Sequence, residues 1–289
     1  MRASLALAAI LTLTSCGREV EPTSLELGEL MLEVFRDANF SNRTEERELQ
    51  ARLIQLTDEI SALADIESLN DGRAVAPPTL TPEYLGGLPE PANEDGEPTD
   101  FDAQTPEAVA HRSHHDLAAF EQIIIDTNQN CIGSDSTKYG DRRFDEDPSC
   151  FIDGSCDRLT FRTLLRTESL IANVWIDAFG DFHRTTITID DQDLDVIIGR
   201  NWTDRTWSSD RGNAHWRQRY VLEVWVPDPA DTTKTLRLFI MWSEADTALT
   251  DTMYRTNVRE GLDESLQNTD VFLDGDICDD RDKTAEDWQ

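Results

Sequence analysis

Apolar residues recur at helical spacing in two runs within residues 24–65. Their positions are Leu27, Leu30, Met31 and Val34 in the first run, and Leu49, Leu53, Leu56, Ile60 and Leu63 in the second. The second run alternates spacings of four and three residues, a heptad pattern too short for a long coiled coil. The pattern predicts an antiparallel helical hairpin whose stripes bury each other, with a partner-binding or dimerising seam as the alternative.

Residues 66–104 have no such periodicity. Seven of the eleven prolines lie between Pro77 and Pro106, mixed with glycines and acidic residues. A segment of this composition cannot bury enough apolar surface to offset the entropy lost on ordering. We therefore expect a disordered, acidic, proline-rich linker here.

A third helix is predicted to begin at Thr105, because Thr105 suits an N-cap and Pro106 suits the first helical position. Its apolar stripe consists of Val109, Leu117, Phe120 and Ile124. Residues 131–156 lie between cysteines and are rich in Asp, Gly, Ser and Arg, without periodicity. We expect an irregular loop there, held by disulfide bonds.

Alternation of apolar and polar positions begins near Phe161 and continues to Ser243. The strands that it predicts are 170–176, 185–189, 194–198, 220–226 and 236–242. Gly180 and Asp181 supply a two-residue turn between the first two strands, and residues 227–233 turn the last hairpin. The result is an antiparallel β-meander of about five strands with one apolar face.

A last helix is predicted from residue 251 to residue 268. Apolar residues recur there at every fourth position: Tyr254, Val258, Leu262 and Leu266. We expect residues 105–289 to form an α+β domain, in which one or two helices pack on the apolar face of the meander. Cystatin-like, NTF2-like and helix-grip domains share such an architecture, which by itself implies no function.

The first sixteen residues have the order of an export signal. Arg2 gives a positive start, residues 5–13 are apolar except for Thr12, and small residues follow. The apolar run is too short to span a bilayer. The run ends in the order Leu13, Thr14, Ser15, Cys16. This order resembles the lipobox of bacterial lipoprotein precursors.

The resemblance implies that residues 1–15 are removed as a signal peptide. Cys16 would then begin the mature chain, with diacylglycerol on its thiol and an acyl chain such as palmitate on its amino group. Residues 16–23 would form a short tether. Gly17 stands where enteric bacteria use Asp to retain lipoproteins in the inner membrane, so the resemblance implies the outer membrane.

The charge of the chain limits its partners. The sequence has 58 acidic and 26 basic residues, which gives a formal net charge of −32. This charge repels the phosphates of nucleic acids and anionic lipid head groups alike. We therefore expect no nucleic-acid partner, and we expect attachment to the membrane through the lipid at Cys16.

Four further cysteines form an even set in a chain expected to be exported. They are Cys131, Cys150, Cys156 and Cys278. An even number in an exported chain favours two disulfide bonds, and all three pairings are open. A zinc site is disfavoured, because no C-x-x-C pair is present and the spacings match no zinc pattern.

Histidines give a second candidate for a metal site. His111 and His115 lie four residues apart on the predicted third helix, a spacing that can grip a metal ion. However, Arg112 stands where the zincin motif H-E-x-x-H needs its glutamate, and no third ligand is identifiable. We therefore expect no metal site, and we expect these histidines, with His114, on a solvated helix face.

The acidic tail around Cys278 gives a third candidate for a cation site. Its aspartates are Asp274, Asp276, Asp280 and Asp282. The tail lacks the Asp-x-Asp-x-Asp-Gly order and the later glutamate of an EF-hand calcium loop. A solvated tail is therefore expected.

The long connection between the third and fourth predicted strands is rich in tryptophan. Its candidate ligand-binding residues are Trp202, Trp207, Arg211, His215 and Trp216. Aromatic rings beside charged and polar side chains can stack on a sugar or hold an aromatic ligand. The alternative is that the tryptophans seal the edge of the sheet.

No short catalytic or nucleotide-binding motif is present, and we assign no catalytic residue and no cofactor. The sequence favours a non-enzymatic protein of the bacterial cell envelope, lipid-anchored, that binds or scaffolds an envelope protein or a glycan. The alternative is an extracytoplasmic domain that binds, or hydrolyses, a glycan or a small apolar molecule at the Trp202–Trp216 loop.

Overall fold

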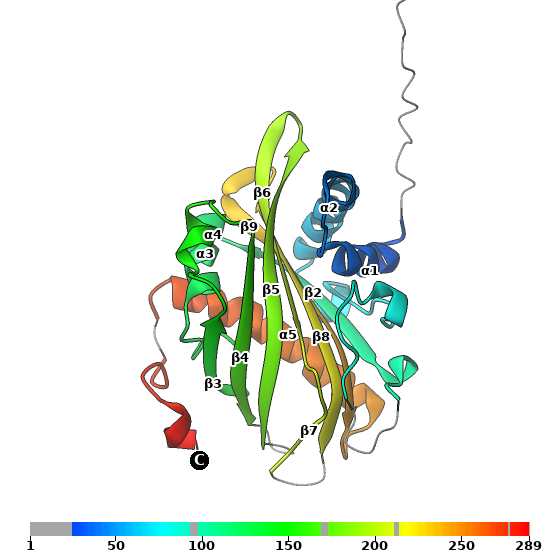
Figure 1. Ribbon diagram of the computed structural model, residues 1–289, viewed down its shortest axis with the longest axis vertical. Helices are drawn as coiled ribbons and strands as arrows, with labels where there is room; N and C mark the ends of the chain where they lie inside the picture. The colour runs from blue at the N-terminus through cyan, green and yellow to red at the C-terminus, as the bar shows by residue number, and fades with distance from the viewer. Residues whose placement is uncertain (1–24, 93–97, 169–172, 211–213, 277, 289) are drawn as a thin grey trace, which may run out of the picture.

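Nine strands form one antiparallel sheet in the computed structural model, which describes residues 25–92, 98–168, 173–210, 214–276 and 278–288 (Figure 1). The strands are β1 (Ala74–Val75), β2 (Thr105–Ser113), β3 (Thr137–Phe144), β4 (Arg158–Glu168), β5 (Asn173–Ile189), β6 (Gln192–Trp202), β7 (Trp207–Ser208), β8 (His215–Asp228) and β9 (Asp231–Asp246). Their order is β1-β2-β9-β8-β6-β5-β4-β3, with β7 paired to β8. The α+β class is confirmed, but the sheet has more strands than the five predicted.

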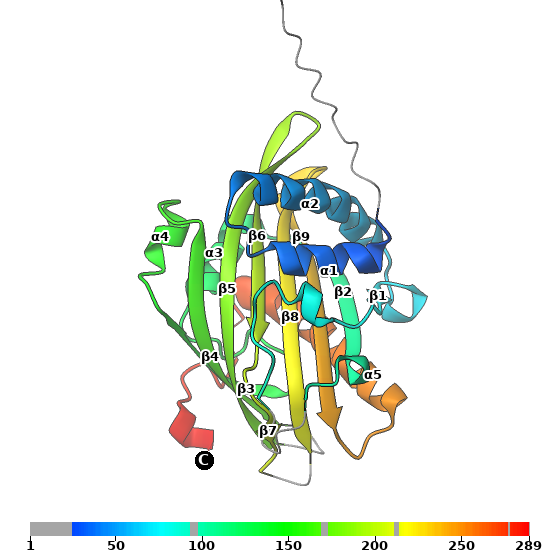
Figure 2. The ribbon, with the colours of Figure 1, turned by 45° about the vertical axis from the view of Figure 1, so that its right-hand side comes forward.

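Within the part of the chain that the structure describes, five α-helices cover the two faces of this sheet. They are α1 (Leu27–Asp37), α2 (Arg43–Ala64), α3 (Leu117–Ile125), α4 (Ser149–Ile152) and α5 (Asp251–Leu273). Helices α1 and α2 lie on one face, and α3 and α5 lie on the other (Figures 1 and 2). Within the described residues, no helix is both long enough and apolar enough to cross a membrane.

The longest strand, β5, corrects a predicted turn. It runs for 17 residues through Gly180 and Asp181, where the sequence predicted a hairpin turn. The turn instead falls at Asp190 and Asp191, whose φ angles of 50° and 62° suit both central positions of a type I′ turn. The hairpin of β8 and β9 is confirmed, with Leu222 opposite Ile240.

Helices α1 and α2 bury their apolar stripes on the sheet as well as on each other. Leu30 and Phe35 of α1 and Leu53 of α2 are buried in one cluster with strand residues such as Leu222. The sequence predicted that the two stripes bury each other. It did not predict the sheet as a further partner, because most of that surface lies more than a hundred residues away in the chain. Both helices therefore belong to the core of the sheet domain.

The proline-rich segment is packed where it is described, so the prediction of a disordered linker is wrong for residues 66–92 and 98–104. Leu80 and Leu85 are buried against the α1–α2 cluster. The carbonyl of Pro78 accepts a hydrogen bond from Trp242 Nε1 at 2.9 Å, and that of Pro89 accepts one from Tyr220 at 3.1 Å. The extended prolines thus supply acceptors for two buried aromatic side chains.

Residues 105–113 form strand β2, so the prediction of a helix from Thr105 is wrong. All nine residues pair with β9, and their neighbours alternate between the two faces: Ala108 contacts the α1–α2 side and Val109 contacts α5. Nonlocal pairing therefore overrides the local N-cap signal. The helix begins at Leu117 instead, capped by Asp116, whose side chain accepts a hydrogen bond from Ala119 N.

Two disulfide bonds join Cys131 to Cys278 and Cys150 to Cys156. Two disulfide bonds were predicted, and the structure selects this one of the three pairings. The intervening residues 131–156 contain β3 and α4, so the prediction of an irregular loop is wrong over those elements.

Helix α5 is confirmed and extends five residues past the predicted end at residue 268. Three acidic side chains form hydrogen bonds between α5 and residues at the β1–β2 edge of the sheet. Glu107 of β2 is fully buried and accepts from Arg259 at 2.9 Å, and Asp263 accepts from Arg73 at 2.6 Å. Asp270 accepts a hydrogen bond from Ser113 at 2.8 Å. These contacts hold the long helix along one face of the antiparallel sheet.

A buried ion pair lies on the α1–α2 side. Asp181 and Arg200 are 0% and 1% exposed, and Arg200 Nε donates to Asp181 at 3.0 Å. Burial alone would raise the pKa of Asp181, but the Arg200 guanidinium outweighs burial and holds that pKa well below its usual range.

We expect Asp181→Asn to lower the free energy of unfolding by about 3–5 kcal/mol at neutral pH, because it leaves Arg200 buried without a counter-charge. Since the folded pKa of Asp181 is lowered, its contribution is present above the unfolded pKa of about 3.9 and is lost as the pH falls through the folded pKa. Urea unfolding at several pH values measures both effects. The exposed Asp193→Asn on β6 is the control and should change stability by less than about 0.5 kcal/mol.

Candidate functional site

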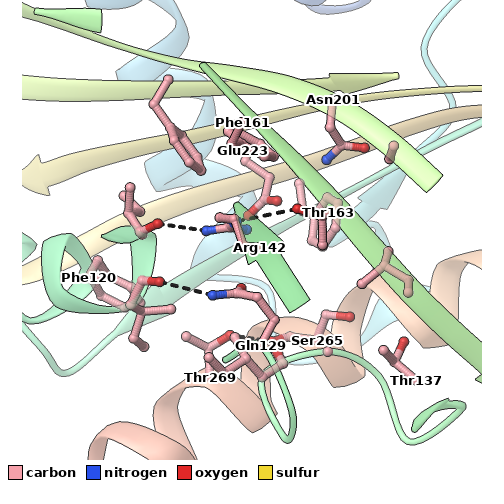
Figure 3. Close-up of a pocket in the computed structure, with 18 of the residues that line it drawn as sticks. Phe120, Gln129, Thr137, Arg142, Phe161, Thr163, Asn201, Glu223, Ser265 and Thr269 are labelled. Atoms are coloured by element: carbon pink, nitrogen blue, oxygen red, sulfur yellow. Dashed lines mark hydrogen bonds between the residues drawn. The ribbon is translucent and has the colours of Figure 1, made fainter. Parts of the chain in front are cut away.

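A cavity of about 160 Å³ lies between the sheet, α3 and α5. Figure 3 shows its lining. The apolar lining residues are Phe120, Ile123, Ile124, Ile132, Phe161, Leu165, Ala178, Phe182, Trp225 and Phe239, and the charged ones are Arg142, Arg219, Glu223 and Arg237. Six adjacent strands, from β9 to β3, contribute residues. Six strands of a flat sheet would span about 24 Å, so the sheet must curve around this small space.

Two glycines make room at the centre of the curved face. Gly180 lies opposite Phe161 and Gly199 lies opposite Phe182 in the strand register. A Cβ on Gly180 would lie 2.1 Å from the Phe161 ring, and one on Gly199 would lie 2.9 Å from the Phe182 ring. The two rings therefore lie over glycine backbone and stack on each other, with centroids 4.6 Å apart.

Arg142 packs its guanidinium group over the rings of Phe161 and Phe182. Its guanidinium carbon is 4.7 Å from the centroid of the Phe161 ring and 5.1 Å from that of Phe182. Its Nη1 donates to the carbonyl of Ile124 at 2.7 Å, and its Nε donates to Thr163 at 3.5 Å (Figure 3). Burial lowers the pKa of Arg142 to about 10, so it remains charged at neutral pH.

Arg219 and Arg237 bring two further positive charges from β8 and β9. Arg219 donates to the Asn201 side chain at 2.6 Å, its one side-chain hydrogen bond with the described residues. Burial lowers its pKa to about 10. Arg237 donates to the carbonyl of Leu266 on α5 at 3.0 Å, while its buried Nε has no partner among the described residues. Both side chains thus retain donors that are not used within the described fold.

Glu223 is the single acidic residue of the lining, and it lies on β8 (Figure 3). Its carboxylate makes no hydrogen bond, and no ion pair within 4 Å, with any described residue. Burial raises its pKa, and the charges of Arg237, Arg142 and Arg219 oppose that rise. The described lining therefore holds three guanidinium groups and one carboxylate. Asp270, outside the lining, lies 3.8 Å from Arg237 and pairs with it, which leaves one positive charge in surplus.

A second hollow of about 310 Å³ lies beside the first, at the Cys131–Cys278 disulfide. Gly133 and Thr137 line both spaces. Although it is larger, the second hollow has one large aliphatic side chain, Val271, and its other described lining residues are mostly small, polar or acidic. The smaller cavity is the better candidate site, because apolar walls with a few converging polar groups are typical of ligand pockets.

The predicted tryptophan site is divided between two places. Trp202 packs on the α1–α2 cluster, whereas Trp207 and Trp216 pair across β7 and β8 and pack near Val174. His215 bonds to Ser208 at 2.9 Å. Arg211 lies outside the described residues. None of the four described residues lines either cavity. Ligand binding by this loop stays a prediction.

The other predicted positions fall as follows. Cys16 lies outside the described residues. His111 belongs to β2, so the prediction of a helix face for His111 and His115 is wrong. Asp274 ends α5, where it meets His114 and His115. Asp276 and Asp280 line the second hollow.

Sequence reasoning missed the charged residues of the cavity. On β8, Arg219 and Glu223 alternate with apolar residues, on the face of the meander that was not predicted to be apolar. Trp225 follows at the next position of the same face and is buried. A tryptophan on the same face of the strand as two charged residues was the available signal that other elements of the protein cover this face too.

No protein-family model matches this chain, and no curated protein matches it in sequence. Among solved structures, the chain is similar to a STAR-related lipid transfer protein (fragment 25–204) from Xanthomonas axonopodis. The likeness has a TM-score of 0.41 and a sequence identity of 11%, and it covers 60% of this chain and 87% of that chain. At this level, the likeness establishes neither a shared fold nor a shared ligand.

We expect Glu223→Gln to change how the free energy of unfolding depends on pH. Because burial raises the folded pKa of Glu223 above its ordinary value of 4.5, the folded protein binds this proton more tightly than the unfolded chain. The carboxyl therefore adds stability below its unfolded pKa and loses that contribution as the pH rises through the folded pKa. Urea unfolding over this range should show wild type losing stability relative to the variant.

The exposed Glu83 offers a matched control, since Glu83→Gln makes the same chemical change outside the cavity. The control should follow wild type at every pH. A Glu223→Gln variant that also follows wild type would show that this carboxyl does not have a raised pKa.

Proposed function

We propose that this protein is a non-enzymatic binding protein that holds a small amphipathic anion in the cavity between the sheet and α5. The ligand has an apolar body, aromatic or short and aliphatic, and one carboxylate. The observation that supports this most directly is that three enclosed arginines line the cavity, whereas two carboxylates, Glu223 in the described lining and Asp270 beside Arg237, are available to balance them.

The charge of the cavity favours an anion. An enclosed guanidinium loses much of its hydration, which costs several kcal/mol unless an opposite charge replaces it. Glu223 can offset one of the three positive charges, and Asp270, 3.8 Å from Arg237, offsets a second. A carboxylate ligand would offset the third, and Arg219 still has N–H groups that could donate to both oxygens.

The size of the cavity limits the apolar body of the ligand. An engineered cavity of about 150 Å³ in another protein binds benzene, whereas pockets for drug-sized ligands are about 300–1,000 Å³. A volume of 160 Å³ therefore suits a ring or a short chain and is too small for a two-chain phospholipid. The rings of Phe120, Phe161 and Trp225 in the lining suit such a ring or short chain.

The lipid anchor is the second part of the proposal. The order of residues 13–16 supports a lipid on Cys16, which would place the domain at a bacterial membrane surface, in the outer membrane by the resemblance stated above. Residues 16–23 would then tether the domain. An envelope protein or a glycan as a further partner stays a prediction from the sequence.

We expect the purified chain to bind benzoate, and Arg219→Met to weaken that binding at least about tenfold, because charge-assisted hydrogen bonds contribute about 1.5–3 kcal/mol. Benzyl alcohol, which has nearly the same shape without the charge, should bind wild type and variant with affinities within about threefold of each other. Isothermal titration calorimetry measures both ligands.

Arg217→Met is the matched control, since Arg217 lies on the same strand and does not line the cavity. It should bind benzoate as wild type does. Wild-type protein that binds benzyl alcohol but not benzoate would contradict the anionic ligand. Equal loss of benzoate in the two methionine variants would contradict the position of the site.

The anchor has its own test in the native host. Mass spectrometry of the protein from membranes should show a chain that begins at Cys16 with diacylglycerol and one acyl chain attached. Cys16→Ala should yield a chain without lipid that leaves the membrane fraction. An intact Met1 with an unmodified Cys16 would refute the anchor and leave the cavity proposal untouched.

A further inference from the structure

Three histidines and two aspartates meet where β2 and α5 both end. His111 ends up beside Asp270, with its Nε2 2.9 Å from Asp270 Oδ2. The next two histidines face Asp274, the C-cap residue of α5. His114 Nε2 lies 2.8 Å from Asp274 Oδ1, and His115 Nε2 lies 3.3 Å from the same oxygen.

We propose that His114, His115 and Asp274 bind one divalent transition-metal ion, with Zn²⁺ as the best match. Their ligand atoms all lie within 4.8 Å of one another. In a tetrahedral zinc site with bonds of about 2.0–2.1 Å, two ligand atoms are about 3.3 Å apart. The distances from the two histidine nitrogens to Asp274 Oδ1, 2.8 Å and 3.3 Å, are close to this ligand–ligand distance. Small side-chain rotations therefore suffice to admit the ion.

The chemistry of the ligands selects the class of ion. Two imidazole nitrogens and one carboxylate oxygen suit zinc and its neighbours, whereas calcium and magnesium require mostly oxygen ligands. Three protein ligands leave a fourth position open for water or another donor. The position at the C-terminus of α5 also favours a cation, because the helix dipole is negative there.

The polar atoms around His114, His115 and Asp274 also favour a bound metal ion at this position. His115 Nε2 is buried and makes no hydrogen bond with any described residue. Asp274 lies 3.3 Å away, but the geometry of a hydrogen bond is not met. His114 Nδ1 faces Asp270 Oδ2 at 3.9 Å. Metal-binding histidines commonly direct their second nitrogen toward such a carboxylate. Asp270 is itself fixed by His111 and Ser113.

From the sequence, His111 and His115 were considered as a metal-binding pair, and no metal site was expected there. The spacing of His111 and His115 matched a helical metal grip, but His111 lies on a strand and is occupied by Asp270. The ligand that the sequence could not identify is Asp274, which the fold brings from 160 residues away. The three ligand residues lie outside the cavity lining, so the metal site can form without the cavity ligand proposed above.

We expect the untagged full chain, first treated with a chelator, to bind one Zn²⁺ per molecule in isothermal titration calorimetry. Loss of a support residue beside a zinc ligand weakens binding about 10–100-fold, so His114→Ala, His115→Ala and Asp274→Asn should each weaken it by at least about 100-fold. His114 and Asp274 are 58% and 49% exposed in their side chains, so their variants should fold.

His215→Ala is the matched control, because it removes a histidine that bonds to Ser208 outside the cluster. It should bind Zn²⁺ as wild type does, and Zn²⁺ should raise the melting temperature of both proteins but not that of His114→Ala. Wild-type protein that binds no Zn²⁺ at micromolar concentration would overturn the proposal. Zn²⁺ binding that survives all three cluster variants would overturn it as well.

Discussion

The packing of Phe161 and Phe182 over Gly180 and Gly199 is the constraint on which the cavity depends. Any side chain at either glycine would meet an aromatic ring, so the rings could not lie against the backbone. Displaced rings would fill the space that Arg142 now shares with them. The two positions without a Cβ therefore let both rings lie against the backbone, which leaves the volume beside the rings open.

Charge is distributed in opposite ways outside and inside this protein. The chain as a whole carries a net charge of −32, yet the cavity encloses three arginines and one glutamate. An anion that approaches the surface is repelled, whereas an anion inside is attracted. Salt screens the long-range repulsion more than it screens an enclosed contact. Higher ionic strength should therefore speed the entry of an anion more than it weakens the bound state.

Local periodicity predicted the elements whose apolar positions form a regular pattern within the element itself. The β8–β9 hairpin and α5 were identified because their apolar positions repeat within one element. Residues 105–113 were predicted as a helix, because pairing with β9, more than 120 residues away, leaves no local trace. The cavity was missed for the same reason. Arg142, Arg219 and Arg237 come from three strands that meet only after the sheet has curved.

Asp270 lies between the cavity and the proposed metal site. Its Oδ1 lies 3.8 Å from Arg237 Nη1 at the cavity, and its Oδ2 lies 3.9 Å from His114 Nδ1. A cation held by His114 would draw this carboxylate toward itself and leave Arg237 less neutralised. Arg237 would then attract an anion in the cavity more strongly. Because such coupling is reciprocal, the anion would strengthen the binding of the cation by the same factor.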